Sequence, residues 1–379
     1  MNKQLTFLDL FSGIGGFRIG LERAGFKSIG YCDCDEHANQ LYKEYFNTSE
    51  ELFFNDIRNI KTEELPDFDI LCAGFPCQSF SIAGKRRGFE DTRGTMFFEV
   101  ARILKDKRPR YFILENVKGL LNHDGGKTFQ TILKVLSDIG YQTQWQLLNS
   151  KFFGVPQNRE RVYIVGCYGK ECAGKIFPIT GTGFENNDSS KKESIVYWKN
   201  SKEKWVEEER NIVGTLRTQS DLCRQPLLKQ IPETSGNTQG SRVYTIDGIS
   251  PCITASHGNL GAFKVRNGTK KGYDEAVPGD GINLAFPQSK TRRGRVGKGC
   301  SQTLDTNCNM GTIDGCRIRR LTPLECFRLQ GFPDEMVSVA KSLGLADTHL
   351  YKMAGNAVTV NVIESVAQRL AQVLNDEDI

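Results

Sequence analysis

The stretch DLFSGIGGF at residues 9–17 decides the fold, because it joins a strand to a helix through a turn of glycines. The apolar strand LTFLDL leads into it, and residues 17–24 continue with helical spacing. Gly13, Gly15 and Gly16 allow a tight turn and let a ligand approach the backbone closely. Their spacing is G-x-G-G rather than the G-x-G-x-x-G of dinucleotide-binding proteins, so a ligand with a pyrophosphate is disfavoured.

Strand-like and helical segments alternate through the first 170 residues. The strand-like segments lie at 5–10, 28–32, 52–56, 68–74, 111–116, 145–150 and 161–166, and the helical ones at 17–24, 36–46, 95–106 and 127–140. This alternation predicts an α/β fold with a mostly parallel sheet and helices on both faces. A further helix at 357–374 carries one apolar face, made of Val358, Val362, Ile363, Val366, Leu370 and Leu374. We expect that face to pack back onto this first domain.

Acidic residues end the strands that follow the glycine turn. Asp33 lies about 20 residues past the glycines, at the strand end where ribose hydroxyls are typically held. Asp56 ends the third strand. Glycines and acids at successive strand ends suit a nucleoside-bearing ligand without a pyrophosphate, and S-adenosylmethionine fits this description.

A cysteine follows the strand at 68–74. The segment GFPCQSFS at 74–81 places Cys77 directly after Pro76, at the carboxyl end of a strand, where open parallel sheets bind ligands. A cysteine in this place is a candidate nucleophile if its surroundings favour the thiolate or activate its target. The next segment, AGKRRG at 83–88, is rich in glycine and in basic residues.

Two further motifs place charged residues at the ends of strands. ENV at 115–117 puts Glu115 at a strand end, where a carboxyl group can act as an acid or base, or can read a base edge. QNRERVYIVG at 157–166 puts Arg159 and Arg161 at alternate positions, so we expect them to share one face of a strand. A pair of cations in this arrangement suits a phosphate or a carbonyl oxygen.

The composition is that of an ordinary globular protein. The chain has 379 residues, of which 25% are charged and 39% hydrophobic, which excludes wholesale disorder and suits two or three domains. Its apolar runs are far shorter than the roughly 20 residues of a membrane helix, and no secretory signal is visible. The 12 cysteines include no CxxC pair, so we expect no metal site, a reducing cytoplasm and mostly buried, hydrophobic cysteines.

The middle of the chain differs from the first 170 residues in composition and periodicity. Residues 179–215 are polar, and the following hundred residues show little helical periodicity. A weak repeat, formed by GTLRT (214–218), PCITA (251–255) and QTLDT (302–306), predicts a second, loop-rich β domain. The net charge is +5, and residues 285–320 hold eight Lys or Arg against two acids. That stretch is a candidate for contact with phosphates.

In this order, the segments resemble the DNA cytosine-5 methyltransferases of bacteria and phages. DLFSGIGGF is similar to the family's cofactor loop, GFPCQSFS to its catalytic loop, and RGTMFFEVARIL (93–104) to the helix that follows. ENV and QNRERVYIVG come next in family order. RRLTPLECFRLQGFPD (319–334) is similar to the motif that supports the recognition domain, and AGNAVTVNVI (354–363) to the C-terminal motif that completes the cofactor pocket.

The resemblance implies a Rossmann-like methyltransferase domain dependent on S-adenosylmethionine and a smaller target-recognition domain. We expect the catalytic domain over 1–178, the recognition domain and hinge over 179–344, and a segment completing the catalytic domain over 345–379. The residues implied to bind the cofactor are Phe11, Gly13, Gly15, Asp33, Asp56, Ile57 and Asn356. Many relatives carry a Trp where this chain has Cys34, so adenine stacking is expected to come from elsewhere, such as Ile57.

The resemblance also implies a covalent mechanism. The Cys77 thiolate adds to carbon 6 of cytosine and makes carbon 5 nucleophilic. Glu115 hydrogen-bonds or protonates ring nitrogen 3, and Arg161 holds the carbonyl oxygen of the ring. Arg159, the other candidate catalytic arginine, supports the loop or a phosphate. The target carbon is inaccessible in a duplex, so the base must be flipped out.

DNA contacts are expected on the loop after the catalytic cysteine. Gln78, Lys85, Arg86 and Arg87 belong to a segment that would close over DNA and contact phosphates.

The middle domain is expected to read the DNA sequence. QGSRVYTIDGISP (239–251) resembles a segment of relatives that faces the DNA groove, so Gln239 and Arg242 are candidates for reading guanine edges or filling the gap left by the flipped base. Relatives often have Thr-Leu where this chain has Cys252 and Ile253, and a Thr-Leu pair occurs instead at 303–304.

Two other functions stay open at this point. One is an RNA cytosine-5 methyltransferase of the same fold acting on tRNA, which the large middle region at 179–344 disfavours. The other is a catalytically silent DNA-binding protein, which the retention of Cys77, Glu115 and Arg161 disfavours. We expect a cytoplasmic monomer acting on double-stranded DNA, in a restriction–modification system with a cognate endonuclease or in a phage or orphan system.

Overall fold

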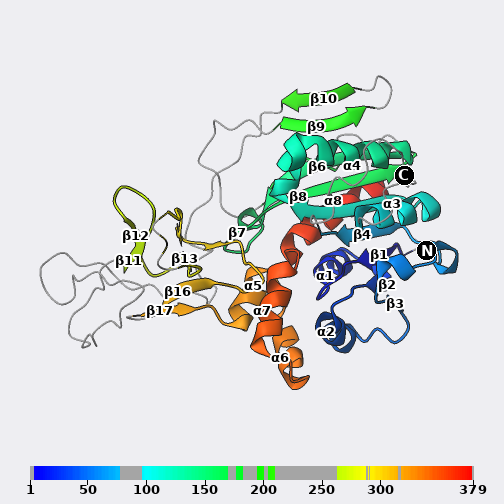
Figure 1. Ribbon diagram of the computed structural model, residues 1–379. Helices are drawn as coiled ribbons and strands as arrows, with labels where there is room; N and C mark the ends of the chain where they lie inside the picture. The colour runs from blue at the N-terminus through cyan, green and yellow to red at the C-terminus, as the bar shows by residue number, and fades with distance from the viewer. Residues whose placement is uncertain are drawn as a thin grey trace, which may run out of the picture. The chain divides into compact units, whose positions relative to one another are not determined.

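A computed structural model describes residues 4–76, 96–169, 176–181, 194–199, 204–209, 263–286, 289, 291–314 and 317–377 (Figure 1). At 194–199, 204–209, 317 and 375–377 only the backbone is described. The chain forms two compact units. Unit 1 comprises Met1–Phe153, Glu160–Thr215 and Ala357–Ile379, and unit 2 comprises Gly154–Arg159 and Leu216–Asn356. The functional domains expected at 1–178, 179–344 and 345–379 stay a prediction.

Unit 1 contains, in its described part, a nine-stranded sheet with helices (Figure 1). The strands are β1 (Thr6–Leu10), β2 (Lys27–Cys32), β3 (Leu52–Phe54), β4 (Ile70–Gly74), β5 (Tyr111–Val117), β6 (Tyr141–Asn149), β8 (Glu160–Tyr168), β9 (Ser194–Lys199) and β10 (Lys204–Glu209). The α-helices are α1 (Gly16–Arg23), α2 (Glu36–Phe46), α3 (Met96–Lys107), α4 (Lys127–Asp138) and α8 (Val360–Glu377). Short 3₁₀ segments lie at Ile57–Asn59, Thr62–Glu64, Lys118–Gly126 and Ser150–Phe152.

The strand order is β10-β9-β6-β8-β5-β4-β1-β2-β3. The pairs β1·β2, β1·β4, β2·β3 and β4·β5 are parallel, as the alternation in the sequence predicts. β8 lies between β5 and β6 and is antiparallel to both. The reversed direction of β8 could not be predicted, because parallel and antiparallel strands show the same alternation of side chains.

Both faces of the central strands are buried. On β5, Tyr111 and Ile113 belong to the core that includes α1 and α8. Phe112 and Leu114 face the other way, into the core that includes α3 and α4. Successive side chains of a strand point to opposite faces, so a continuous apolar run marks a strand covered on both sides. Unit 1 is therefore a sheet between two helical layers, as predicted.

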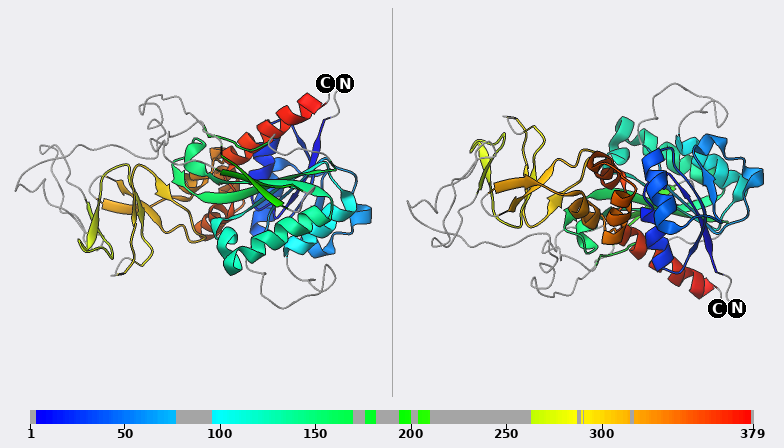
Figure 2. Two further views of the ribbon diagram at one scale, coloured as in Figure 1. Left: turned by 90° about the horizontal axis from the view of Figure 1, so that it is seen from above. Right: turned by 90° about the horizontal axis from the view of Figure 1, so that it is seen from below.

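Helix α8 returns from the C-terminal part of the chain to pack against α1 (Figure 2). Its predicted apolar face is buried in the same core as Phe17 and Leu21 of α1, which confirms the expected packing. The approach is close at Gly20, where an added Cβ would lie 2.7 Å from Cβ of Ile363. Arg23 and Glu364 form an ion pair between the two helices at 3.0 Å.

Unit 2 is rich in short strands and loops, as predicted, and also carries helices. Its described strands are β7 (Gln157–Asn158), β11 (Phe263–Arg266), β12 (Tyr273–Ala276), β13 (Gly281–Asn283), β14 (Val296–Gly297), β15 (Ser301–Gln302), β16 (Met310–Asp314) and β17 (Arg317–Arg320). Its helices are α5 (Pro323–Leu329), α6 (Asp334–Ser342) and α7 (Asp347–Asn356). A small core of Phe263, Val265, Ala276, Ile282 and Ile313 lies between the sheets.

The described cysteines are mostly buried thiols, as expected. Cys32, Cys72, Cys308 and Cys326 are buried and free, and Cys34 is free and exposed. Cys167 takes part in a disulfide bond, which the sequence did not predict.

Candidate active site

The turn between β1 and α1 uses backbone conformations that few residues adopt. Phe11, Gly13 and Gly15 have φ values of +57°, +52° and +84°, in the region that favours glycine. A Cβ on Gly15 would lie 2.5 Å from Cε2 of Phe46, so a side chain there would force the Phe46 ring to move. Around Gly13, in contrast, no described atom lies within 4 Å of an added Cβ, and this side of the turn is open.

Asp33, at the end of β2, holds this turn in place. The Gly13 amide donates to Oδ2 of Asp33 at 2.7 Å, and the Asp35 amide donates to Oδ1 at 2.8 Å. Asn39 on α2 donates to the Asp33 carbonyl at 2.8 Å. Burial raises the pKa of the Asp33 carboxyl, although these backbone hydrogen bonds oppose the shift. The sequence-predicted residues Phe11, Gly13, Gly15 and Asp33 therefore come together at one end of the sheet.

Asp56 and Ile57 follow β3 in unit 1. Asp56 accepts a hydrogen bond from the Arg58 amide, and both of its oxygens accept from the Arg58 guanidinium. This hydrogen bonding lowers the pKa of Asp56. Ile57 is only 2% exposed. Asn356, the remaining predicted cofactor residue, is the exposed last residue of α7 and belongs to unit 2.

Two buried polar atoms near the turn lack a hydrogen-bond partner among the described residues. Ser12 Oγ and Asn39 Oδ1 are buried and make no hydrogen bond to the described residues. Buried polar groups are nearly always hydrogen-bonded, so such atoms point to a polar ligand or to water. The open side of Gly13 and these two acceptors fit a nucleoside-bearing cofactor.

Sequence reasoning missed a buried ionic cluster below the turn. Asp9 on β1 is fully buried, and burial raises the pKa of its carboxyl well above the ordinary value while Arg18 opposes the shift. Arg18 on α1 forms a bidentate pair with Glu51 at 2.9 and 2.7 Å. The signal was present in the sequence, because Asp9 lies between two leucines of the apolar strand TFLDL, and an acid is seldom buried without a partner.

A second group of polar residues lies where β4, β5 and β8 meet. Gly74, the last residue of β4, is the register partner of Glu115 on β5. An added Cβ on Gly74 would lie 3.7 Å from Oε2 of Glu115. Asn116 is 3% exposed and donates to the Phe75 carbonyl at 2.8 Å. The ENV motif is thus tied to the backbone that leads, two residues later, to Cys77.

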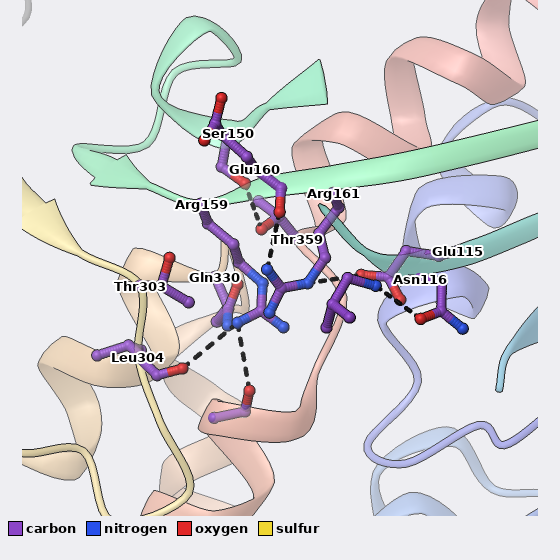
Figure 3. Close-up of polar contacts among 12 residues, drawn as sticks. Glu115, Asn116, Ser150, Arg159, Glu160, Arg161, Thr303, Leu304, Gln330 and Thr359 are labelled. Atoms are coloured by element: carbon purple, nitrogen blue, oxygen red, sulfur yellow. Dashed lines mark hydrogen bonds and ion pairs between the residues drawn. The ribbon is translucent and has the colours of Figure 1, made fainter. Parts of the chain in front are cut away.

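Arg161 on β8 pairs with Glu115 (Figure 3). Its Nε lies 3.1 Å from Oε1 of Glu115, and the two side chains are 14% and 10% exposed. The pair is partly shielded from water, so it is stronger than an ion pair on the surface. An acidic group and a cation therefore lie together next to the strand end that precedes Cys77.

Arg159 has different partners from Arg161. It is 3% exposed and donates to the Leu304 carbonyl at 3.5 Å and the Gly355 carbonyl at 3.3 Å, all within unit 2 (Figure 3). Its neighbour Gln157 is fully buried and accepts from the Leu304 amide at 3.0 Å. The Thr-Leu pair at 303–304 is thus the one that contacts the QNR segment in the described part of the chain. Burial of Arg159 favours support of the loop over contact with a phosphate.

Several predicted site residues cannot be placed. Cys77, Gln78, Lys85, Arg86, Arg87, Gln239 and Arg242 lie outside the described residues.

Comparisons with known proteins identify the family of the chain. The family model for the C-5 cytosine-specific DNA methylase matches residues 5–372. The chain belongs to this family. It is 37% identical to the type II methyltransferase M.HpaII of Haemophilus parainfluenzae, over 99% of this chain and 92% of that one. It is 34% identical to the orphan methyltransferase M.SPRI of Bacillus phage SPR, over 97% of each chain.

Solved structures support the fold of this DNA methylase. The Entamoeba histolytica methyltransferase EhMeth matches with a TM-score of 0.55 and 18% identity, over 98% of this chain and 99% of that one. The S. pombe Dnmt2 methyltransferase matches with a TM-score of 0.53 and 18% identity, over 99% and 100%. No helix in the described part of the chain is long and apolar enough to cross a membrane.

Membership of the family makes the protein a sequence-specific DNA cytosine methyltransferase. Family and fold imply that the methylation depends on S-adenosylmethionine. The two rival functions, tRNA methylation and silent DNA binding, are accordingly disfavoured.

Proposed function

We propose that the protein methylates carbon 5 of a cytosine flipped out of duplex DNA, with Cys77 as nucleophile and Glu115 and Arg161 acting on the ring. The ion pair between Glu115 and Arg161 carries this proposal, because it lies beside Gly74, from which the chain continues through Phe75 and Pro76 to Cys77. A carboxyl group and a guanidinium at this place suit ring nitrogen 3 and the neighbouring carbonyl oxygen of cytosine.

The residues divide the chemistry between them. The Cys77 thiolate forms a bond to carbon 6, and the electron pair of the 5,6 double bond makes carbon 5 nucleophilic. Glu115 stabilises or protonates ring nitrogen 3 as electron density moves into the ring. Arg161 donates hydrogen bonds to the ring oxygen, where negative charge develops. After methylation, loss of the carbon 5 proton re-forms the double bond and expels the Cys77 thiolate.

The residues around the glycine turn would hold S-adenosylmethionine. We assign Phe11, Gly13, Gly15, Asp33, Asp56, Ile57 and Asn356 to this pocket, supported by the open side of Gly13 and the partnerless Ser12 Oγ and Asn39 Oδ1. When bound, the cofactor supplies an electrophilic methyl group to carbon 5.

Arg159 is a positioning residue in this proposal. Its guanidinium is buried and donates to two main-chain carbonyls of unit 2. It precedes Arg161 by two residues, so it fixes the chain just before β8 begins. Gln78, Lys85, Arg86 and Arg87 remain proposed contacts to DNA on the catalytic loop, and Gln239 and Arg242 remain proposed readers of bases.

The direct test is methylation by the full chain in a host without other cytosine methylation. Bisulfite sequencing should find protected cytosines in one short motif with wild type and none with Cys77→Ala. Duplex DNA with 5-fluorocytosine in that motif should form a denaturant-stable adduct with wild type alone, because fluorine cannot leave as a proton does. Protected cytosines in the Cys77→Ala host would overturn the assignment of the nucleophile.

A parallel assay on tRNA addresses the remaining alternative. Methyl transfer to tRNA without transfer to duplex DNA would contradict the proposal. A protein that binds duplex DNA and S-adenosylmethionine without methyl transfer would be the silent DNA binder instead.

The biological setting is proposed from the relatives. M.SPRI is named an orphan methyltransferase and M.HpaII a type II methyltransferase, so both an orphan or phage role and a restriction–modification role have support. We propose a monomer acting in the cytoplasm. Light scattering checks the oligomeric state, and cleavage of unmodified host DNA by an endonuclease encoded beside it would reveal a cognate enzyme.

A further inference from the structure

The basic stretch at 285–320 is mostly occupied by contacts inside unit 2. Arg295 is fully buried and donates to the carbonyls of Asn283 and Arg266. Lys298 pairs with Asp280 at 2.8 Å. These cations hold the unit together, so they are poor candidates for phosphate contacts.

The two arginines near the end of this stretch are occupied in the same way. Arg319 pairs with Glu325 at 2.8 Å and with Asp314 at 3.0 Å. Arg320 donates to the Cys308 carbonyl, and its guanidinium lies 3.8 Å from the centre of the Tyr351 ring.

Two arginines in the segment between β13 and β14 are different. Arg292 and Arg293 form no ion pair with an acid in the described part of the chain, and Arg293 is exposed. The Arg292 guanidinium lies 5.5 Å from the centre of the Phe286 ring. Among the described residues, therefore, no acid neutralises the charge of these two side chains.

Phe286, in the same segment, is unusually exposed. Its exposed fraction is 73%, against 41% for Val117 and 37% for Phe53, the next most exposed large apolar residues of the described chain. Its φ of +54° is in the left-handed region, which is unfavourable for a bulky residue. An exposed aromatic ring in a strained backbone points to a function, because neither feature stabilises the folded chain.

The described residues of this segment are held by hydrogen bonds to one another and to Gly268. The Ser289 amide donates to the Phe286 carbonyl at 3.0 Å, and the Arg292 amide donates to Ser289 Oγ at 3.2 Å. The Gly268 amide donates to the Arg292 carbonyl at 2.6 Å. An added Cβ on Gly268 would lie 2.4 Å from the Thr291 carbonyl oxygen, so this approach requires glycine. Hydrogen bonds thus hold the backbone at Phe286 and at Arg292, next to Arg293, in place.

We propose that Phe286, Arg292 and Arg293 form a DNA-contacting tip of unit 2. The arginines bind backbone phosphates, and the Phe286 ring makes apolar contact with base edges in the groove. The inference rests on duplex DNA being the substrate, as proposed above. DNA is favoured over a protein partner because the described residues of the tip include two arginines without an acidic partner and no acid, which suits a polyanion.

The test is equilibrium binding of the full chain to a duplex that contains its methylation motif, measured over a range of salt concentrations. The logarithm of the association constant falls linearly with the logarithm of the salt concentration. Arg293→Ala should make this slope less steep by about 0.9, the value expected for one lost phosphate contact. Phe286→Ala should weaken binding roughly tenfold and leave the slope unchanged, because it removes an aromatic contact and no charge. Phe286→Tyr keeps the ring and should bind within about twofold of wild type.

Matched controls come from unit 1. Phe53→Ala removes another exposed ring beneath a cation, since Lys43 Nζ lies 3.7 Å from its centre. Lys61→Ala removes an exposed cation that pairs with Glu64. Both should bind DNA as wild type does, and melting temperatures show that every variant is folded.

The outcomes separate the two proposals. If wild type binds and methylates DNA, and the tip variants have the same affinity and salt dependence as the controls, the proposal that the tip contacts DNA is wrong. The proposed function is then unaffected. A wild type that neither binds nor methylates duplex DNA would overturn the proposed function and the tip with it.

Discussion

Glu115 Oε1 and Arg161 Nε lie 3.1 Å apart on neighbouring antiparallel strands, β5 and β8, and both side chains are largely shielded from solvent. The ion pair restrains both side chains. In the proposed mechanism, the carboxyl and guanidinium groups are therefore oriented before cytosine binds, so little reorganisation is needed at the moment of reaction.

Glu115→Gln should lower kcat by roughly 100-fold or more, because an amide cannot supply a proton to ring nitrogen 3. Dissociation constants for the target duplex should change little. Single-turnover methylation at saturating DNA measures the effect. A rate near that of wild type would remove Glu115 from the mechanism, whatever the binding data show.

Arg159→Met should lower the free energy of unfolding by about 1–3 kcal/mol, because it leaves the carbonyls of Leu304 and Gly355 without their buried donor. Arg159→Lys should recover part of this loss. Urea denaturation measures both. Arg369→Met is the control. That arginine is exposed on α8, so its substitution should change the free energy of unfolding by less than about 0.5 kcal/mol. Equal stabilities for the two Met variants would contradict the positioning role.

Gly20→Ala should destabilise the protein by about 1–3 kcal/mol, because the new methyl group would lie 2.7 Å from Cβ of Ile363 and 2.8 Å from the Glu364 amide nitrogen. α8 would have to move away from α1. Gly119→Ala is the matched control, because the atom nearest to a Cβ added at Gly119 lies 3.9 Å away. Thermal unfolding of both variants compares them, and a wild-type melting temperature for Gly20→Ala would show that α8 is not closely packed.

The titration of Asp9 should lower the free energy of unfolding as pH rises. Burial raises the pKa of its carboxyl above the ordinary 3.8, so in the window above that value the folded state keeps a proton that the unfolded chain has lost. Stability contributed by this proton is present at low pH and declines as pH increases through the raised pKa. Asp9→Asn removes the titrating group, so its unfolding free energy should fall less between about pH 4 and pH 7 than that of wild type. If the unfolding free energies of wild type and Asp9→Asn fall with pH at the same rate, the titration of Asp9 does not cause the pH dependence.

Local patterns predicted much of the fold. The helix expected at 36–46 is α2 (Glu36–Phe46), and the predicted apolar face of the C-terminal helix is buried in the core. These elements follow from periodicity and from turn glycines, which are properties of neighbouring residues.

Features that depend on distant parts of the chain could not be predicted. Arg159 and Arg161 look alike in the sequence, and only contacts from residues 304 and 355 on one side and residue 115 on the other separate them. The basic stretch at 285–320 looked uniform for the same reason, because the acids that neutralise Lys298 and Arg319 come from Asp280, Asp314 and Glu325.

The return of α8 to α1 has a consequence for how the protein is made on the ribosome. The glycine turn precedes unit 2 in the chain, whereas the helix that covers the core behind this turn follows unit 2. Proteins fold domain by domain during synthesis, but unit 1 cannot complete its core until α8 has left the ribosome after unit 2. A polypeptide that stops before α8 would therefore leave the apolar face of α1 without its partner helix, and it should be more prone to degradation than the chain that contains α8.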